Sequence, residues 1–314
     1  MRGVGPADTS QSDINLTTVE LTADAEINDW ANASVTLLFE DAAFGGESGF
    51  SVDQGTVTIG NTEKFPLYFT GGAMYVPFGA LLTHFPDDPA VNQPMTLLLG
   101  ETREKAALMG LEYAKLSLAG YAFNGDMEKA AGENHVEHFG FDAHYEYGDE
   151  AQGINLLIGA GYINSIAESD GLEGGLANLG VTSLQDFVGG FNAYLQVGYS
   201  RFFFDAEIMT ATDHFLPSEL ATGTGAGARP SVWNLEGGCN WNWGRNLEIA
   251  FKYAGSHDTE KLGFPKNRYG LALNQTVREG VILSLAYLHD EFDQADVNAS
   301  DDRDVMVMQL GVEF

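Results

Sequence analysis

Three histidines, His135, His138 and His144, lie close together in the sequence, and imidazole is the commonest metal ligand among side chains. Polar and apolar residues alternate around them, which is typical of a β-strand. Such a strand would place His138 and His144 about 20 Å apart, with His135 on the opposite face. We therefore predict histidines of a strand wall and no metal site here.

Two further segments have the composition of a ligand-binding loop. Residues 290–304 are rich in Asp but lack the ordered spacing and the glycine of an EF-hand, so the loop predicts weak surface cation binding. Residues 221–230 place glycines at alternate positions, which is not a nucleotide-binding pattern, and predict a loop. With no Ser/His/Asp constellation, we predict no enzyme and no cofactor, and an outer-membrane hydrolase is the alternative left open.

The remaining charged residues alternate with apolar ones. In residues 246–256, Leu247, Ile249 and Phe251 occupy one face, and Glu248 and Lys252 occupy the other. The charged positions that we predict to face a water-filled lumen are Glu20, Asp24, Glu26, Glu112, Asp142, Glu146, Asp205, Glu207, Glu236, Glu248, Lys252 and Arg268. Carboxylates dominate this set, so the lumen should prefer cations.

Fifteen segments show this period of two. They are residues 14–28, 30–40, 53–60, 66–78, 105–114, 116–125, 135–148, 154–165, 187–199, 201–215, 230–243, 246–256, 267–278, 281–290 and 303–314. Short and long connections alternate strictly between them, which is the arrangement of outer-membrane barrels with turns at one rim and loops at the other. The sequence thus predicts an all-β protein, a transmembrane antiparallel up-and-down β-barrel in a bacterial outer membrane.

A soluble β-sandwich also has alternating strands and is the main alternative. Strands of ten or more residues fit a tilted membrane crossing better than the five or six typical of sandwiches. Aromatic residues such as Trp30, Tyr113 and Tyr199 lie near strand ends, where amphipathic rings suit a membrane interface. The chain ends in MVMQLGVEF, which looks like the terminal strand that barrel-assembly machinery recognises. These three features favour the barrel.

Composition limits the partners. The 314 residues include 15 Lys and Arg against 45 Asp and Glu, a formal charge of −30, so nucleic acid is excluded as a partner. Cys239 is the single cysteine, and no disulfide can form within one chain. The sequence has no run of 18 apolar residues and no apolar signal segment at its start.

Fifteen is an odd number, whereas bacterial single-chain barrels have even numbers of strands. The first strand, 14–28, would begin at the loop rim, and the last, 303–314, would end at the turn rim. We expect a sixteenth strand and a signal peptide upstream, with residues 1–13 as a polar remnant and 14–314 as one barrel domain. An odd barrel with one parallel pair is the alternative.

The longest connection, residues 79–104, contains an apolar run at Leu97 to Leu99 that should not lie bare in water. One interpretation folds this loop into the mouth of the barrel. The charged residues that it would present there are Asp87, Asp88, Glu101, Arg103 and Glu104. The other interpretation extends the following strand above the membrane.

Several stretches resemble the LbtU family of siderophore porins. They are TVELTADAEINDW at 18–30, VTIGNTEKFPLYFTGGAMYVPFG at 57–79, LLLGETREKAALMGLEY at 97–113, YAFNGD at 121–126 and GYINSIAESDGL at 161–172. The resemblance extends from about residue 13 to Phe314 and implies a sixteen-stranded barrel for siderophore uptake. It supplies no ligand residues that can be carried over to this chain.

Two functions follow from these patterns. The first is a channel without a plug domain, passing small solutes or ferric siderophores through an acidic lumen. The second is a structural or adhesive barrel whose acidic loops bind cations. Expected partners are outer-membrane lipid and lipopolysaccharide, and the sequence is compatible with a homo-oligomer.

Overall fold

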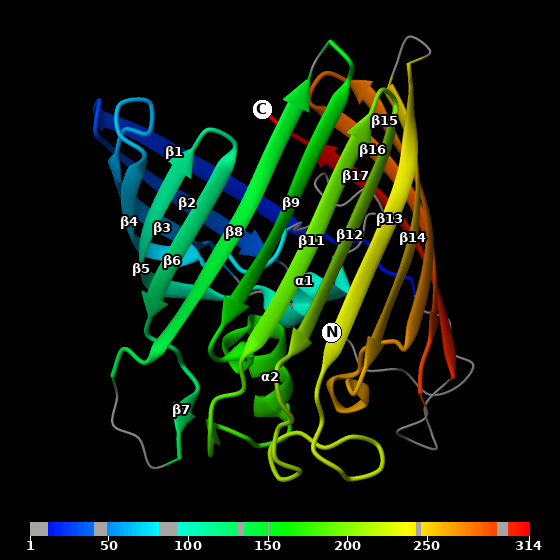
Figure 1. Ribbon diagram of the computed structural model, residues 1–314. Helices are drawn as coiled ribbons and strands as arrows, with labels where there is room; N and C mark the ends of the chain where they lie inside the picture. Colours follow the sequence, from blue (N-terminus) through cyan, green and yellow to red (C-terminus); the bar gives the residue numbers. More distant parts are fainter. Residues whose placement is uncertain are drawn as a thin grey trace.

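The computed structural model describes residues 12–40, 49–81, 93–130, 135–149, 151–242, 246–293 and 301–314. Within them, fifteen strands form one continuous sheet in which each strand pairs with the next along the chain (Figure 1). All fourteen ladders of this sheet are antiparallel. A single curved sheet excludes the two-sheet sandwich and confirms the predicted fold class.

The strands lie close to their predicted positions. Their bounds are β1 Thr18–Asn28, β2 Ala31–Glu40, β3 Ser51–Gly60, β4 Leu67–Tyr75, β5 Arg103–Tyr113, β6 Leu116–Phe123, β8 His138–Asp149, β9 Ile154–Ile163, β11 Gly190–Tyr199, β12 Phe202–Ala211, β13 Ser231–Asn242, β14 Asn246–His257, β15 Asn267–Arg278, β16 Val281–Glu291 and β17 Asp302–Val312. The short segments β7 Glu128–Lys129 and β10 Ser183–Leu184 form a separate parallel pair.

Tight turns set the register at one end of the barrel, which we call the turn side. Tyr113 pairs with Leu116 and Tyr199 with Phe202, so two residues connect each hairpin. The first residue of each of these turns, Ala114 or Ser200, has a φ of +56°. Left-handed backbone is what two-residue hairpins require, because it matches the twist of the strands. The long connections lie at the other end, the loop side.

The two faces of the sheet differ in polarity, as the alternation predicts. On β17 the apolar side chains of Met306, Met308 and Leu310 are 76%, 76% and 64% exposed and point outward. On β14, outward Phe251 is exposed, whereas inward Lys252 is buried. An apolar outer surface with a polar inner one is stable only when lipid covers the outside.

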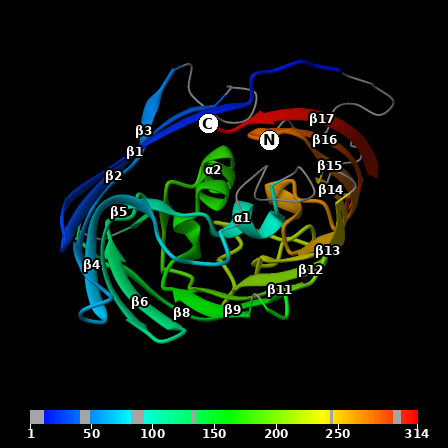
Figure 2. The ribbon, with the colours of Figure 1, turned by 90° about the horizontal axis from the view of Figure 1, so that it is seen from above.

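The sheet curls until β1 returns towards β17 (Figure 2). These two edge strands form no ladder with each other in the described residues. Inward positions on β1, such as Asp24 and Glu26, are correspondingly exposed. The odd number of strands in the sequence led us to expect such an unpaired seam between β1 and β17. The sixteenth strand itself stays a prediction.

The loops contribute helices that the alternation did not predict. They are α1 Met95–Gly100, α2 Asp170–Asn178 and two single 3-10 turns, η2 Ile166–Glu168 and η3 Glu260–Leu262. Helices α1 and α2 lie inside the ring of strands when the barrel is viewed along its axis (Figure 2). None of the helices in the described residues is long and apolar enough to span a bilayer.

Candidate functional site: the barrel interior and its narrowed mouth

A hydrophobic cluster fills the interior at the loop side. Helix α1 buries Met95, Leu97 and Leu99 against α2 and the inner faces of β12 and β13. Leu172 and Leu176, one helical turn apart on α2, are fully buried in the same cluster. In the part of residues 79–104 that the structure describes, the loop folds inward, which is the arrangement of the first interpretation.

Close backbone contacts hold the ends of this loop. The N–H of Ala80 donates to Oε1 of Glu207, 2.7 Å away on β12. The neighbouring Gly79 has a φ of +101°, and a Cβ there would lie 2.6 Å from the same oxygen. A Cβ on Gly100 would lie 2.2 Å from Sδ of Met209. These glycines let the backbone approach the inner wall, where Glu207 anchors the loop.

The buried carboxyl group of Glu168 joins its own loop segment to the loop after β6 and to the start of β8. Oε2 of Glu168 accepts hydrogen bonds from the N–H groups of Asp126 at 2.8 Å and Met127 at 3.4 Å. Its Oε1 lies 3.5 Å from Nε2 of His138 at the start of β8. Burial, with added repulsion from Glu104 and Glu173, raises the pKa of Glu168 to about 8. At neutral pH the protonated acid is thus the favoured form in the packed mouth.

Glu101 has a similar environment at the C-terminus of α1. Burial and the nearby carboxylates of Asp170, Glu40 and Asp53 raise its pKa to about 8. The backbone N–H of Asp170 donates to the carbonyl of Glu101 at 2.8 Å, which links α1 to α2. Two acids with raised pKa values therefore lie where the loops contact each other.

We expect the mouth to loosen as the pH rises. The pKa of Glu168 in the packed state, about 8, is above its usual value of 4.5, so the packing loses stability as pH increases between these values. Single-channel conductance should rise severalfold from about pH 6 to about pH 9. Glu168→Gln keeps an acceptor for the Asp126 N–H without a titratable proton, and should remove the part of this rise that Glu168 causes, leaving the part due to Glu101.

The control is Glu279→Gln, which neutralises an exposed carboxyl in a turn-side hairpin and should leave the pH profile unchanged. A wild-type conductance that is flat over this pH range in a correctly folded barrel would contradict the prediction.

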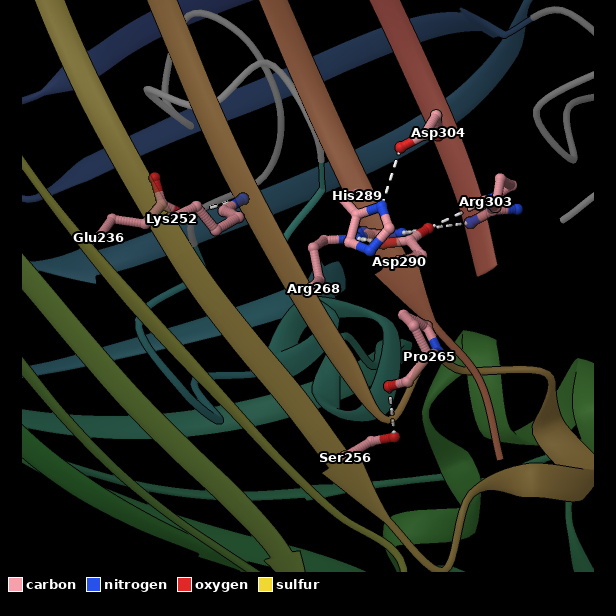
Figure 3. A network of polar contacts seen from close by, with 9 residues as sticks. All are labelled: Glu236, Lys252, Ser256, Pro265, Arg268, His289, Asp290, Arg303 and Asp304. Carbon is pink, nitrogen blue, oxygen red and sulfur yellow. Dashed lines mark hydrogen bonds and ion pairs between the residues drawn. The ribbon is translucent and has the colours of Figure 1, made fainter. Parts of the chain in front are cut away.

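Ion pairs line the inner wall beyond the helices. Lys252 Nζ on β14 lies 2.8 Å from Glu236 Oε1 on β13, and both side chains are fully buried. Asp290 lies between Arg268 and Arg303, accepting from Nε of Arg268 at 2.6 Å and Nε of Arg303 at 3.1 Å (Figure 3). Both bases predicted for the lumen are therefore paired with carboxylates, which cancels much of their positive field.

The structure places all twelve predicted lumen residues on the inner face. These are Glu20, Asp24, Glu26, Glu112, Asp142, Glu146, Asp205, Glu207, Glu236, Glu248, Lys252 and Arg268. Asp205, Glu236 and Lys252 are adjacent in register across β12, β13 and β14. The three acids of β1 lie apart from them, beside the unpaired seam. Whether these positions set ion preference stays a prediction.

The five residues predicted for the mouth do not share one location. Glu101 and Glu104 lie on the inner side near α2, whereas Asp87 and Asp88 lie outside the described residues. Arg103 is the first residue of β5, so the strand begins two residues earlier than predicted, and alternation with exposed Lys105 and Met109 gives Arg103 an outward position. Its positive charge nevertheless opposes the rise in the pKa of both Glu101 and Asp170, so it acts on the acids of the mouth.

The turn-side half of the interior is open. A cavity of about 420 Å³ lies between the inner faces of β8, β9, β11 and β12, with Glu146, Asn155, Gln196 and Asp205 among its lining residues. These polar side chains line the space together with apolar ones such as Leu157 and Phe203. The interior thus combines an open turn-side half with a mouth narrowed by apolar loops.

The three clustered histidines do not meet. His138 contacts Glu168, and His144 Nδ1 lies 2.9 Å from Asp142 Oδ2. In the part of the chain that the structure describes, no group of three or more His, Cys, Asp or Glu side chains could hold a metal ion. Part of the acidic loop 290–304 lies outside the described residues.

Sequence comparison finds similar proteins but no matching family model. The UPF0422 protein of Legionella pneumophila (strain Philadelphia 1) is 29% identical over 304 residues, which cover 90% of this chain and 55% of that protein. The chain therefore spans about half the length of the curated relatives it matches.

Solved structures decide the architecture. OprB of Pseudomonas putida superposes with a TM-score of 0.60 at 10% identity, covering 93% of this chain and 86% of OprB. The fold is that of outer-membrane porins. The anion-selective porin from Comamonas acidovorans superposes with a TM-score of 0.57 at 12% identity, covering 99% of this chain and 87% of that porin. This porin fold and the lipid-compatible outer face indicate a bacterial outer-membrane location, as predicted.

Proposed function

We propose that this chain is an outer-membrane channel for small neutral or cationic solutes. The observation that carries the proposal is the polarity of the inner face, where carboxylates outnumber bases and the bases Lys252 and Arg268 each bind a carboxylate. Unpaired acids in a partly closed space attract cations and repel anions. Reversal potentials in a salt gradient test it: a cation-selective pore supports the proposal, and an anion-selective one refutes it.

The finer proposal is passage of ferric siderophores. Its support is the resemblance of residues 18–30, 57–79 and 97–113 to siderophore porins. Charge favours neutral or cationic chelates, since a polyanionic one would cross an acidic chamber. Lys105 is exposed at an outward position of β5, so it does not offer such an anion a charge inside the mouth. Uptake of defined ferric chelates by a deletion strain tests this step, and normal uptake of all of them would refute it.

We expect the chamber acids to set the selectivity. Asp205→Asn together with Glu146→Gln removes two carboxyl groups that line the cavity, so the cation-to-anion permeability ratio should fall towards one. Neither carboxylate anchors the loop or pairs with Lys252, so folding should be retained. Reversal potential measured at low salt gives the largest signal, because screening weakens the field as salt rises.

A matched control removes two exposed loop charges, Asp186→Asn with Asp213→Asn, and changes the net charge equally. It should leave the ratio within error of the wild type. An equal loss of selectivity in both variants would show that the chamber acids have no special role.

One observation favours a structural barrel instead. The mouth is filled by buried residues such as Phe78, Leu99, Leu172 and Phe215, so the lumen is constricted at the loop side. A structural barrel gives no conductance steps in a planar bilayer at any pH, whereas a gated channel gives steps whose size or frequency grows when the loops are released.

A further inference from the structure

Two carboxyl groups of the inner wall lack a protein partner. Other inward acids have one: Glu207 accepts a hydrogen bond from the backbone of the mouth loop, and Glu236 contacts Lys252. Among the described residues, the side chains of Glu146 on β8 and Asp205 on β12 have neither a hydrogen bond nor an ion pair. Both line the cavity of the turn-side half, so both are available to a solute there.

These two carboxyl groups lie in one row of the inner wall. Glu146 pairs in register with Leu157, which pairs on its other side with Gln196. Gln196 in turn pairs with Asp205. Three strand spacings therefore separate the two carboxyl positions, about 14 Å along the wall. The side chains of Leu157 and Gln196 stand between them, so one small ion cannot bridge both carboxyl groups.

Glycines leave space in the wall beside this row. A Cβ on Gly198 would meet no atom closer than 3.5 Å, and a Cβ on Gly148 would meet Oδ1 of Asn155 at 3.7 Å. Leu157 and Phe203 add apolar surface to the same cavity of about 420 Å³. The space therefore offers an apolar middle with one carboxyl group on either side.

A further acid favours a cation at the Asp205 end. Glu236 pairs in register with Asp205 across β12 and β13. Its Oε1 is bound by Lys252 and Asn234, whereas its Oε2 has no hydrogen-bond partner among the described residues. Carboxylates opposite each other on two strands repel, and a cation beside Asp205 relieves this repulsion. A nearby ammonium group also favours the ionised form of a carboxyl group.

We propose that the row of Glu146, Leu157, Gln196 and Asp205 binds a linear diamine, with one ammonium group on each carboxylate and the methylene chain on Leu157 and Phe203. Hydrogen bonds between ammonium and carboxylate are charge-assisted. Joining two ammonium groups by one chain makes the second contact intramolecular, which strengthens binding. A hydrated metal ion would leave the apolar middle unused. The inference rests on the proposed channel function, because it names a class of cation that the channel would take.

Calorimetric titration of the protein in detergent at low salt tests the site with three amines. Octamethylenediamine is long enough to reach both carboxylates, tetramethylenediamine is too short to pass the two side chains between them, and aminooctanol has the long chain with a hydroxyl in place of one ammonium group. Octamethylenediamine should bind about fivefold more tightly than either of the others, which is the gain from a second solvent-accessible ion pair.

Two variants and a matched control locate the site. Glu146→Gln and Asp205→Asn should each lower the affinity for octamethylenediamine about fivefold, to that of aminooctanol. Glu112→Gln removes an exposed inward carboxyl group of β5 that does not line the cavity, and should leave the affinity unchanged. Unheated gel mobility shows that each variant is folded. Equal affinity for the two diamines, unchanged affinity in Glu146→Gln, or an equal loss in Glu112→Gln would overturn the proposal.

Binding is measured without conductance, so the site and the channel function can fail separately. A barrel that prefers octamethylenediamine but gives no conductance steps would refute the channel and support the site. A cation-selective channel that binds the two diamines equally would refute the site and support the channel.

Discussion

Replacing Leu99 by Asp is expected to open the mouth and increase single-channel conductance severalfold. Leu99 is fully buried between α1 and the wall, in the hydrophobic cluster that fills the loop side. An ionised carboxylate in that position has no partner and would have to leave the cluster to be hydrated. Helix α1 should therefore detach from β12 and β13, while the ladders of the fifteen strands, which do not involve α1, remain closed.

Leu179→Asp provides the matched control, since Leu179 follows the last residue of α2 and is 44% exposed. The same chemical change at that position should leave conductance unaltered. Planar-bilayer recordings distinguish the two variants, with heat-dependent gel mobility as the check on folding. A folded Leu99→Asp barrel with wild-type conductance would mean that α1 does not obstruct the path, and no steps in either protein would favour the structural barrel.

The strands could be predicted because each one has one face towards lipid and the other towards the barrel interior. Positions such as Phe251 and Lys252 differ in polarity because one contacts lipid and the other the interior, and this contrast recurs at every second residue. Loop lengths gave the orientation of the barrel for a similar reason: turn-side hairpins such as Tyr113 to Leu116 are fixed locally by backbone geometry.

The helices in the mouth could not be predicted in this way. Helix α2, DGLEGGLAN, contains three glycines and has poor intrinsic helix propensity, so it is stabilised by burial of Leu172 and Leu176. The spacing of these two leucines was the available signal. Helix α1 has only six residues, too few for a helical period to be distinguished from a buried strand.

The side-chain contacts between neighbouring strands could not be predicted from the sequence either, because they depend on the register in which the strands pair. Glu236 and Lys252 were both predicted to be inward, but their contact follows from the pairing of β13 with β14. A candidate list from alternation can therefore assign faces, but it cannot assign partners.

Breaking the Glu236 and Lys252 pair should have the largest effect on stability. Lys252→Met leaves Glu236 fully buried beside Asn234 without its cation, and one Glu236 oxygen already lacks a hydrogen-bond partner. Removing one member of a buried ion pair typically costs about 3–5 kcal/mol, because the remaining charge stays desolvated. We expect a loss of at least about 3 kcal/mol in the free energy of unfolding in urea.

Two comparisons separate this cause from a simple loss of packing. The double variant Lys252→Met with Glu236→Leu replaces both charges by apolar groups and should recover most of the stability, since it removes both members of the buried ion pair. Lys64→Met removes an exposed base that lies 2.8 Å from Asp29, and should cost less than about 1 kcal/mol, because water solvates the remaining carboxylate. If the double variant were as unstable as Lys252→Met alone, the stability would come from the shape of the lysine side chain and not from its charge.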